Sequence, residues 1–343
     1  MLKKVLVVLF MFVAVLSLQG CNIKQLNEKM IVQGMGIDFA DGDYKVTVMY
    51  INTHNDESGN SHKTATGKGR TITEAVSDIV TGNGLEPLYS HNSFVILGRS
   101  LCESGVNEAM EFFAGYYQFK PSISVLAAQD SAAEIMKQDS ITPEVITRIS
   151  DNESTVGLSI TMPLYTFWGD IRSRSSSACT AFISAEDNKI KSNGIAVFDG
   201  DKLSHILSSS QTMGVAVIRG KTDMSGEAIP VEGEQKSFSL SNINTETNVK
   251  AENGVMYCNI VVKAEANMYE YISDKKNIEE KIEKSINSIT RDAVKECTEN
   301  GSDIFGFGKR LRFSDKKIYN TVKDWKKFIK NGTYNISSEI SVR

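Results

Sequence analysis

The stretch between Lys236 and Tyr271 constrains the fold most strongly, because apolar and polar residues alternate along most of it. It reads KSFSLSNINTETNVKAENGVMYCNIVVKAEANMYEY, with turn residues at Asn242 and Asn253-Gly254. A period of two places successive side chains on opposite faces of a strand. The stretch therefore predicts antiparallel strands that bury one face and expose the other.

A long one-sided helix is expected next, over about 277–299. Asn277 with Glu280 resembles a capping box, and Gly301 is placed to end the helix. Its apolar residues recur every three or four positions, which is typical of a helix with one buried face: Ile278, Ile282, Ile286, Ile289, Ala293 and Cys297. A second helix over about 316–330 and a closing strand over 333–342 complete a C-terminal α+β domain, residues 236–343.

The first half of the chain predicts another α+β domain, residues 30–192, with a mixed sheet. Asp41-Gly42-Asp43 lies between two strand-like runs and indicates a hairpin. The expected elements are strands 30–39 and 44–52, an exposed loop 53–70, a helix 73–80 ended by Gly82, a strand 93–98, a helix 103–117 and a strand 122–128.

The region between these domains predicts a middle β-rich domain or segment, residues 193–235. A hairpin over 193–207 turns at Asp199-Gly200, TMGVAVIRG (212–220) is expected as a third strand, and 221–235 as a linker. The fold class is thus α+β and multidomain, with three domains of mixed or antiparallel sheets and packed helices. Their combined length is too great for one typical core.

The N-terminal residues indicate where in the cell the protein is located. Lys3 and Lys4 precede 14 uncharged apolar residues, Val5 to Leu18, fewer than the roughly 20 needed to cross a bilayer. Leu18-Gln19-Gly20-Cys21 resembles a bacterial lipobox. We expect residues 1–20 to be a lipoprotein signal peptide, Cys21 to carry covalent lipid, and 21–29 to be a lipidated stalk. An uncleaved anchor and a plain secretory signal are the alternatives.

Composition restricts partners and chemistry. The formal charge of −4 becomes more negative once Lys3 and Lys4 are removed, so the surface as a whole does not attract nucleic acid or anionic lipid. Cys102, Cys179, Cys258 and Cys297 are widely spaced, and we expect free thiols, although two disulfides remain an alternative.

Motifs for catalysis, cofactors or metals are not found in the sequence. His54 and His62 lie in one polar loop without metal-ligand spacing. ATGKGRT (65–71) lacks the spacing of a phosphate loop, and no G-x-S-x-G occurs. No enzyme activity and no cofactor other than the lipid are therefore expected.

One segment, GSDIFGFGKRL (301–311), combines glycines and aromatic residues directly after the long helix. Glycine permits positive φ and close approach, while phenylalanine anchors a turn in a core. The segment is either a buried structural corner or an interaction surface. Its candidate residues, together with one downstream aromatic residue, are Asp303, Phe305, Gly306, Phe307, Gly308 and Trp325.

Several segments in order resemble the Ger(x)C family of spore germination lipoproteins. They are the cysteine at 21, MIVQGMGIDFADGDYKVTV (30–48), SHNSFVILG (90–98), GIAVFDGDKL (194–203) and KECTENGSDIFGFGKRL followed by Trp325. The resemblance implies a three-domain ectodomain that is lipid-anchored to the outer face of the inner spore membrane. It also implies assembly with the A and B membrane subunits of a germinant receptor, and no catalysis.

Two other functions stay open at this point. A lipoprotein that itself binds a small germinant would need a cleft between domains with convergent polar groups. An exported hydrolase would need a nucleophile or metal set.

Overall fold

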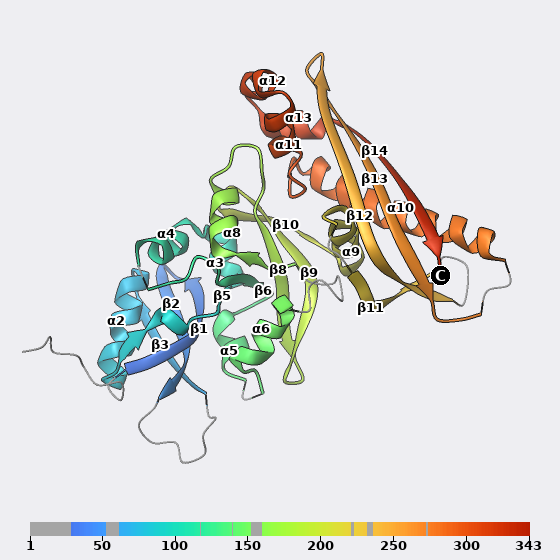
Figure 1. Cartoon of the computed structure of the whole chain (residues 1–343). Helices are drawn as coiled ribbons and strands as arrows, with labels where there is room; N and C mark the ends of the chain where they lie inside the picture. The colour runs from blue at the N-terminus through green and yellow to red at the C-terminus, as the bar shows by residue number, and fades with distance from the viewer. Residues whose placement is uncertain are drawn as a thin grey trace, which may run out of the picture.

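The structure is a computed structural model in which two β-sheets lie side by side, each packed with helices (Figure 1). It describes residues 29–52, 62–116, 118–138, 140–151, 160–220, 223–231, 236–271 and 274–343. The expected signal peptide, the acylation site Cys21, nearly all of the stalk, and His54 lie outside the described residues.

The first sheet is mixed. Its order is β10-β9-β8-β6-β5-β1-β2-β3, with β4 beside β1 and β7 beside β6. The central strands β1, β5, β6 and β8 run parallel, and antiparallel hairpins extend both ends. The strands are β1 (Lys29–Ala40), β2 (Asp43–Asn52), β3 (Lys63–Gly69), β4 (Glu86–Leu88), β5 (Phe94–Leu97), β6 (Ser124–Ala128), β7 (Met162–Pro163), β8 (Cys179–Glu186), β9 (Lys189–Asp199) and β10 (Lys202–Leu207).

Both faces of this sheet are covered by helices because its central strands are apolar on both sides. In β5, Val95 and Leu97 face one core while Phe94 and Ile96 face the other. The first core includes α2 (Ile72–Asn83), α3 (Arg99–Ser104), α4 (Asn107–Gly115) and α8 (Leu164–Ile171). The second includes α5 (Ala132–Met136) and α6 (Pro143–Asp151), and the short η2 (Tyr89–His91) precedes β5.

The second sheet has the order β11-β12-β13-β14. It contains β11 (Asp223–Pro230), β12 (Ser237–Glu252), β13 (Val255–Met268) and β14 (Thr333–Val342), with β14 parallel to β13. The long helix α10 (Lys275–Glu299) covers one face through Ile278, Ile282 and Ile286. Three short helices follow it at one end of the sheet: α11 (Phe307–Ser314), α12 (Lys316–Thr321) and α13 (Trp325–Lys330) (Figure 1).

The helix α10 confirms the predicted stripe and its end but not its capping box. Its N-cap is Asp274, whose side chain accepts from the N–H of Asn277. At the other end Gly301 has φ +71, and the Ser302 N–H bonds to the Cys297 carbonyl at 2.8 Å. That bond closes the last turn as a glycine stop does.

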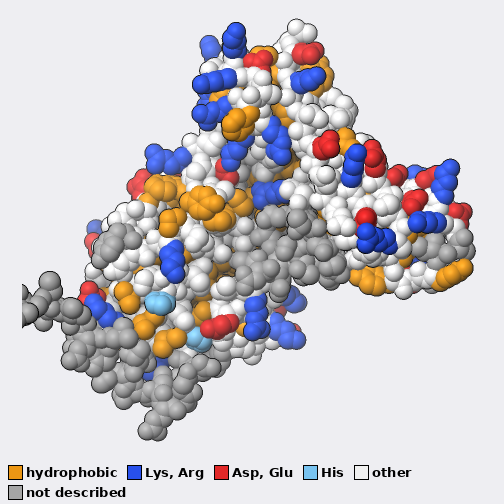
Figure 2. Space-filling model, viewed as in Figure 1, with side chains coloured by type: hydrophobic (Ala, Val, Ile, Leu, Met, Phe, Trp, Pro, Cys, Tyr) orange, Lys and Arg blue, Asp and Glu red, His pale blue; other side chains and the backbone are white. Residues whose placement is uncertain are grey.

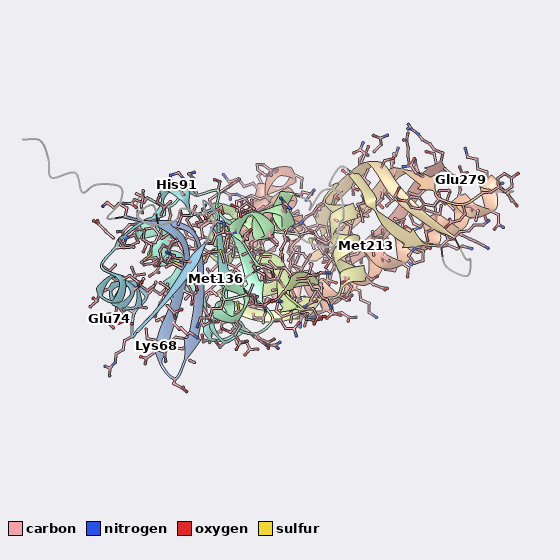
Figure 3. The ribbon with its side chains drawn as sticks, turned by 90° about the horizontal axis from the view of Figure 1, so that it is seen from below. Lys68, Glu74, His91, Met136, Met213 and Glu279 are labelled. Carbon is pink, nitrogen blue, oxygen red and sulfur yellow. The ribbon has the colours of Figure 1, made fainter. Side chains whose placement is uncertain are left out.

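The strand predicted over 212–220 is wrong. Residues Ser209–Ile218 form the helix α9, begun by a capping box between Ser208 and Gln211. Helix α9 is buried on nearly all sides between the two sheets. A helix that is buried all round is apolar all round, so its sequence lacks the one-sided pattern by which a helix is recognised. In Figure 3, Met213 marks α9 at the junction, while Lys68 and Glu279 lie towards opposite ends of the molecule.

Other predicted elements need smaller corrections. Within the expected loop 53–70, residues 63–69 form the edge strand β3, and the expected linker contains β11. The single helix predicted over 103–117 is wrong, because this stretch contains the end of α3 and the whole of α4, separated where Gly105 has φ +130. Helix α2 continues past Gly82 to a cap at Gly84. The helix predicted over 316–330 is interrupted between α12 and α13, where Asp324 caps the second.

The hairpins and remaining strands agree with the sequence. Asp41 and Gly42 take positive φ in the first turn, and Gly200 does so in the hairpin of β9 and β10. Asn242 also has positive φ, but it marks a bulge within the single strand β12 rather than a turn between strands. The hairpin over 193–207 belongs to the first sheet, with β9 running across the predicted boundary at 192. The division into three domains stays a prediction.

Candidate functional site

The segment 301–311 is organised by one buried carboxylate. The Asp303 side chain is 3% exposed. One of its oxygens accepts the backbone N–H groups of Phe305, Gly306 and Phe307 at 3.1, 2.8 and 3.0 Å, and the other accepts that of Gly308 at 2.8 Å. Those of Gly306, Phe307 and Gly308 are otherwise unpaired donors at the start of α11. Asp303 thus forms the turn and caps the following helix.

Burial raises the pKa of Asp303, and the four N–H donors oppose that rise. All four donors belong to the loop that contains Asp303, so the hydrogen bonds of this carboxylate stabilise the fold. An acid or base for catalysis must instead reach a substrate proton. The geometry therefore indicates a structural role for Asp303.

Two glycines let the loop adopt this shape. Gly306, the N-cap of α11, has φ +78, a conformation that other residues adopt at a cost. Gly308 has no room for a side chain, since an added Cβ would lie 2.6 Å from the Ser175 carbonyl oxygen. The tight approach joins α11 to the loop before β8.

The two phenylalanines anchor the turn. Phe305 and Phe307 are 6% and 0% exposed, and their rings stack with centroids 5.2 Å apart. Phe307 also meets Tyr334 of β14, with centroids 5.4 Å apart. The corner is therefore continuous with the core of the second sheet.

The same corner fastens the second sheet to the first. The Ser177 N–H bonds to the Asp303 carbonyl at 2.8 Å, and the Asp303 N–H bonds to the Ser177 hydroxyl at 3.1 Å. From the end of α9, Arg219 donates to the Ile304 carbonyl at 2.9 Å and to the Cys179 sulfur at 3.1 Å. We call residues 301–308 with Ser175, Ser177 and Arg219 the joint.

Trp325 lies in α13 rather than in the joint. It is 6% exposed and packs against Tyr319 and Phe328, with ring centroids 4.9 and 5.5 Å away. The start of α13 still approaches the corner, because an added Cβ on Gly301 would lie 3.0 Å from that of Lys326. Five of the six candidate residues thus meet in one loop, and the sixth supports the helices beyond it.

Sequence reasoning missed the partners of the corner. Ser175 and Ser177 lie in the serine-rich run RSRSSSACT (172–180), and Arg219 follows helix α9, which was expected as a strand. Apart from the unusual run itself, no local pattern could have paired residues so far apart in the chain.

The four described cysteines are free and buried. Burial raises the pKa values of the Cys102, Cys258 and Cys297 thiols, which keeps them protonated and unreactive. His62 lies 3.4 Å from Glu144. Among the described residues, no group of three or more His, Cys, Asp or Glu side chains is placed to hold a metal ion.

A hollow of about 760 Å³ lies beside the joint, where α8 of the first sheet faces α11 and α12. Arg174 lines it, with the guanidinium 4.6 Å from the centre of the Tyr319 ring, and Lys309 pairs with Asp170 at 2.7 Å. Arg312 and Lys316 complete a basic wall. Such a wall favours an anion over a cation.

A second hollow, about 490 Å³, lies near the ends of β1 and β6. Its lining is mixed in charge, with Asp38, Asp130, Lys68 and Arg99 among it. The Asp38 carboxylate is already engaged, since it accepts from Ser131 Oγ and from the N–H groups of Ala132 and Ala133 at 2.8–3.0 Å.

None of the described helices is both long and apolar enough to cross a bilayer.

Comparisons with known proteins cover almost the whole chain. Residues 22–185 match the model of the spore germination protein N-terminal domain, and residues 193–343 match that of the spore germination B3/GerAC-like C-terminal domain. No curated protein matches the chain significantly. A solved structure titled "Crystal Structure of the GerBC protein" shares the fold, with a TM-score of 0.57 and 20% identity over 94% of this chain and 99% of that one. The chain belongs to the GerAC/GerBC family of spore germination proteins.

Proposed function

We propose that this chain is a non-enzymatic, lipid-anchored subunit of a spore germinant receptor. The observation that carries the proposal is that both halves match the N- and C-terminal models of one spore germination family, in order. The hydrogen bonds of Asp303 support a structural rather than a catalytic protein, since its carboxylate accepts four backbone N–H groups of its own loop.

The lipid anchor is supported by the position of Cys21. The N-terminal family match begins at residue 22, immediately after the proposed acylation site. Each buried CH₂ contributes about 0.8 kcal/mol, so two or three acyl chains on Cys21 would hold the chain on a bilayer. The proposed location is the outer face of the inner spore membrane.

The proposed partners are the A and B membrane subunits of the receptor. A tether raises the local concentration of the ectodomain at the membrane, so interfaces of modest affinity suffice for assembly. The joint holds the two sheets together, and in this proposal the ectodomain meets its partners as one body.

The test is recovery of partners from detergent-solubilised spore membranes, using the tagged chain and mass spectrometry. We expect a polytopic membrane protein and a transporter-like protein to be recovered with it. The Cys21→Ala variant serves as the comparison, and it should move from the membrane fraction to the soluble fraction. Recovery of the lipidated chain alone, or a Cys21→Ala variant that stays on membranes, would contradict the proposal.

One observation favours a second candidate, a lipoprotein that itself binds a small germinant. The hollow of about 760 Å³ lies between the two sheet units and is lined by Arg174, Arg312, Lys316 and Tyr319. Its chemistry suits a small anionic or aromatic molecule. Calorimetric titration of germinant molecules into the purified chain, with Arg174→Gln as the control, would detect such binding.

A further inference from the structure

Positive charge gathers on the three short helices α11, α12 and α13, which we call the basic lobe (residues 307–330). The lobe carries seven lysines and two arginines against two aspartates, a net charge of +7. The whole chain has a formal charge of −4, so the remaining residues together carry −11. Figure 2 shows Lys and Arg side chains crowded at this end of the molecule.

These charges face solvent. All nine cationic side chains of the lobe are exposed. Lys309 pairs with Asp170, and Lys326 pairs with Asp199. Within the described residues no ion pair involves Lys316, Lys317, Lys323, Lys327 or Lys330. Their charge is therefore not neutralised by neighbouring carboxylates.

An apolar side chain stands out among the cations. Phe313, at the end of α11, is 89% exposed, although neighbouring Leu311 is fully buried. Between α12 and the β12–β13 hairpin, a hollow of about 470 Å³ has Ile318, Val322 and Phe328 in its lining and Lys323 and Lys327 beside them. Exposed aromatic residues beside lysines are typical of segments that lie in a membrane interface.

We propose that the basic lobe is a docking surface for an anionic phospholipid bilayer, separate from the acyl anchor. The lysines would lie over the lipid phosphates, and Phe313 would enter the boundary between headgroups and acyl chains. Lysine outnumbers arginine seven to two in the lobe. Lysine carries a flexible point charge that does not require a fixed partner geometry, and clusters of about four to eight basic residues are typical of surfaces that bind anionic lipid. This contact would orient the ectodomain on the membrane, which attachment through one acylated residue does not do by itself.

The experiment measures co-sedimentation of chain 22–343 with lipid vesicles. All described elements lie downstream of residue 28, so this chain keeps both sheets without an acyl group. One vesicle preparation is phosphatidylcholine alone, and in the other a third of the lipid is phosphatidylglycerol. We expect binding only to the second, and loss of that binding as salt rises from about 0.1 M to about 1 M.

Two sets of four lysine-to-glutamine substitutions distinguish the effect of charge in the basic lobe on vesicle binding from the effect of net charge. Changing Lys316, Lys317, Lys323 and Lys327 should weaken binding by about tenfold or more. The matched control changes the exposed lysines Lys275, Lys276, Lys284 and Lys295 of α10, removes the same charge, and should leave binding within about twofold. Phe313→Ser tests the apolar contact and should also weaken binding, by about tenfold.

Equal weakening by the two lysine sets would overturn the proposal, as would equal binding to both kinds of vesicle or none to either. Unchanged unfolding temperatures of the variants would establish that they are folded. If vesicles are not bound but the lobe set abolishes capture of a receptor subunit, the surface binds an acidic protein segment instead. The assay contains neither acyl chain nor receptor subunit, so its result is independent of the proposed receptor function.

Discussion

At the scale of single residues, Asp303 organises the corner through its hydrogen bonds. Four backbone N–H groups converge on its carboxylate, and both Phe305 and Phe307 depend on that turn to reach the core. An isosteric amide would place an NH₂ group against N–H donors and would remove the charge.

We therefore expect Asp303→Asn to lower the free energy of unfolding by about 2–3 kcal/mol. Urea denaturation of chain 22–343 measures the change. Asp324→Asn is the matched control, because Asp324 caps α13 by accepting from the Lys327 N–H at an exposed site, where asparagine caps nearly as well. Equal losses in the two variants would mean that the buried carboxylate has no special part.

A second residue, His205, should make the stability of the fold depend on pH. His205 in β10 is half-buried, its Nε2 has no hydrogen-bond partner within the described structure, and burial lowers its pKa although Glu296 opposes this. The unfolded chain therefore binds a proton more readily than the folded one. The stability that depends on neutral His205 is present above the ordinary pKa of about 6.5 and is lost as pH falls below it.

The measurement compares unfolding of the parent chain and His205→Gln between about pH 7.5 and pH 5.5, the range around the ordinary histidine pKa. The parent should lose more stability than the variant on acidification. His91→Gln, at an exposed site, should follow the parent. A His205→Gln curve parallel to the parent curve would contradict the prediction.

At the scale of elements, α9 and α10 pack closely against each other at Gly214. An added Cβ on Gly214 of α9 would lie 2.3 Å from the Ile289 carbonyl oxygen of α10. That atom is helix backbone, so one helix would have to move rather than a side chain rotate.

Gly214→Ala should lower stability by about 1–3 kcal/mol through overpacking. Gly82→Ala, in α2 with open space around it, should instead raise stability by about 0.5–1 kcal/mol because alanine favours helix. The two substitutions are chemically identical, and thermal unfolding should give shifts of opposite sign. A stabilised Gly214→Ala variant would show that the crossing is loose.

At the scale of the whole molecule, Arg219 ties the two sheets together. Its guanidinium reaches the Ile304 carbonyl in the corner and the Cys179 sulfur in the first sheet. Since the joint is shared, the two units should unfold together.

Replacing this arginine by methionine leaves the Ile304 carbonyl without that donor. We expect Arg219→Met to lower the free energy of unfolding by about 1.5–3 kcal/mol. It should also separate the single calorimetric unfolding transition into two. Arg291→Met, at an exposed position of α10, should retain the single transition. Two transitions already present in the parent chain would contradict the shared joint.

What the sequence determined by itself was local. Alternation along 236–268, the stripe of α10 and the turn at Asp41-Gly42 follow from the chain's own periodicity and turn chemistry, so these elements were predicted correctly. The family, too, was recognisable from short segments such as residues 303–308. The segment 212–220 shows the limit, because an apolar run of that length fits either a strand or a buried helix.

Only the tertiary structure decided the partners. The contacts of Asp303 with Ser177, of Gly308 with Ser175 and of Arg219 with Ile304 join residues far apart in the chain, and no local period encodes them. The basic lobe is similar, since its charges are plain in the sequence but their exposure on one end is not. Periodicity reports which face of an element is buried, whereas packing decides what lies against that face.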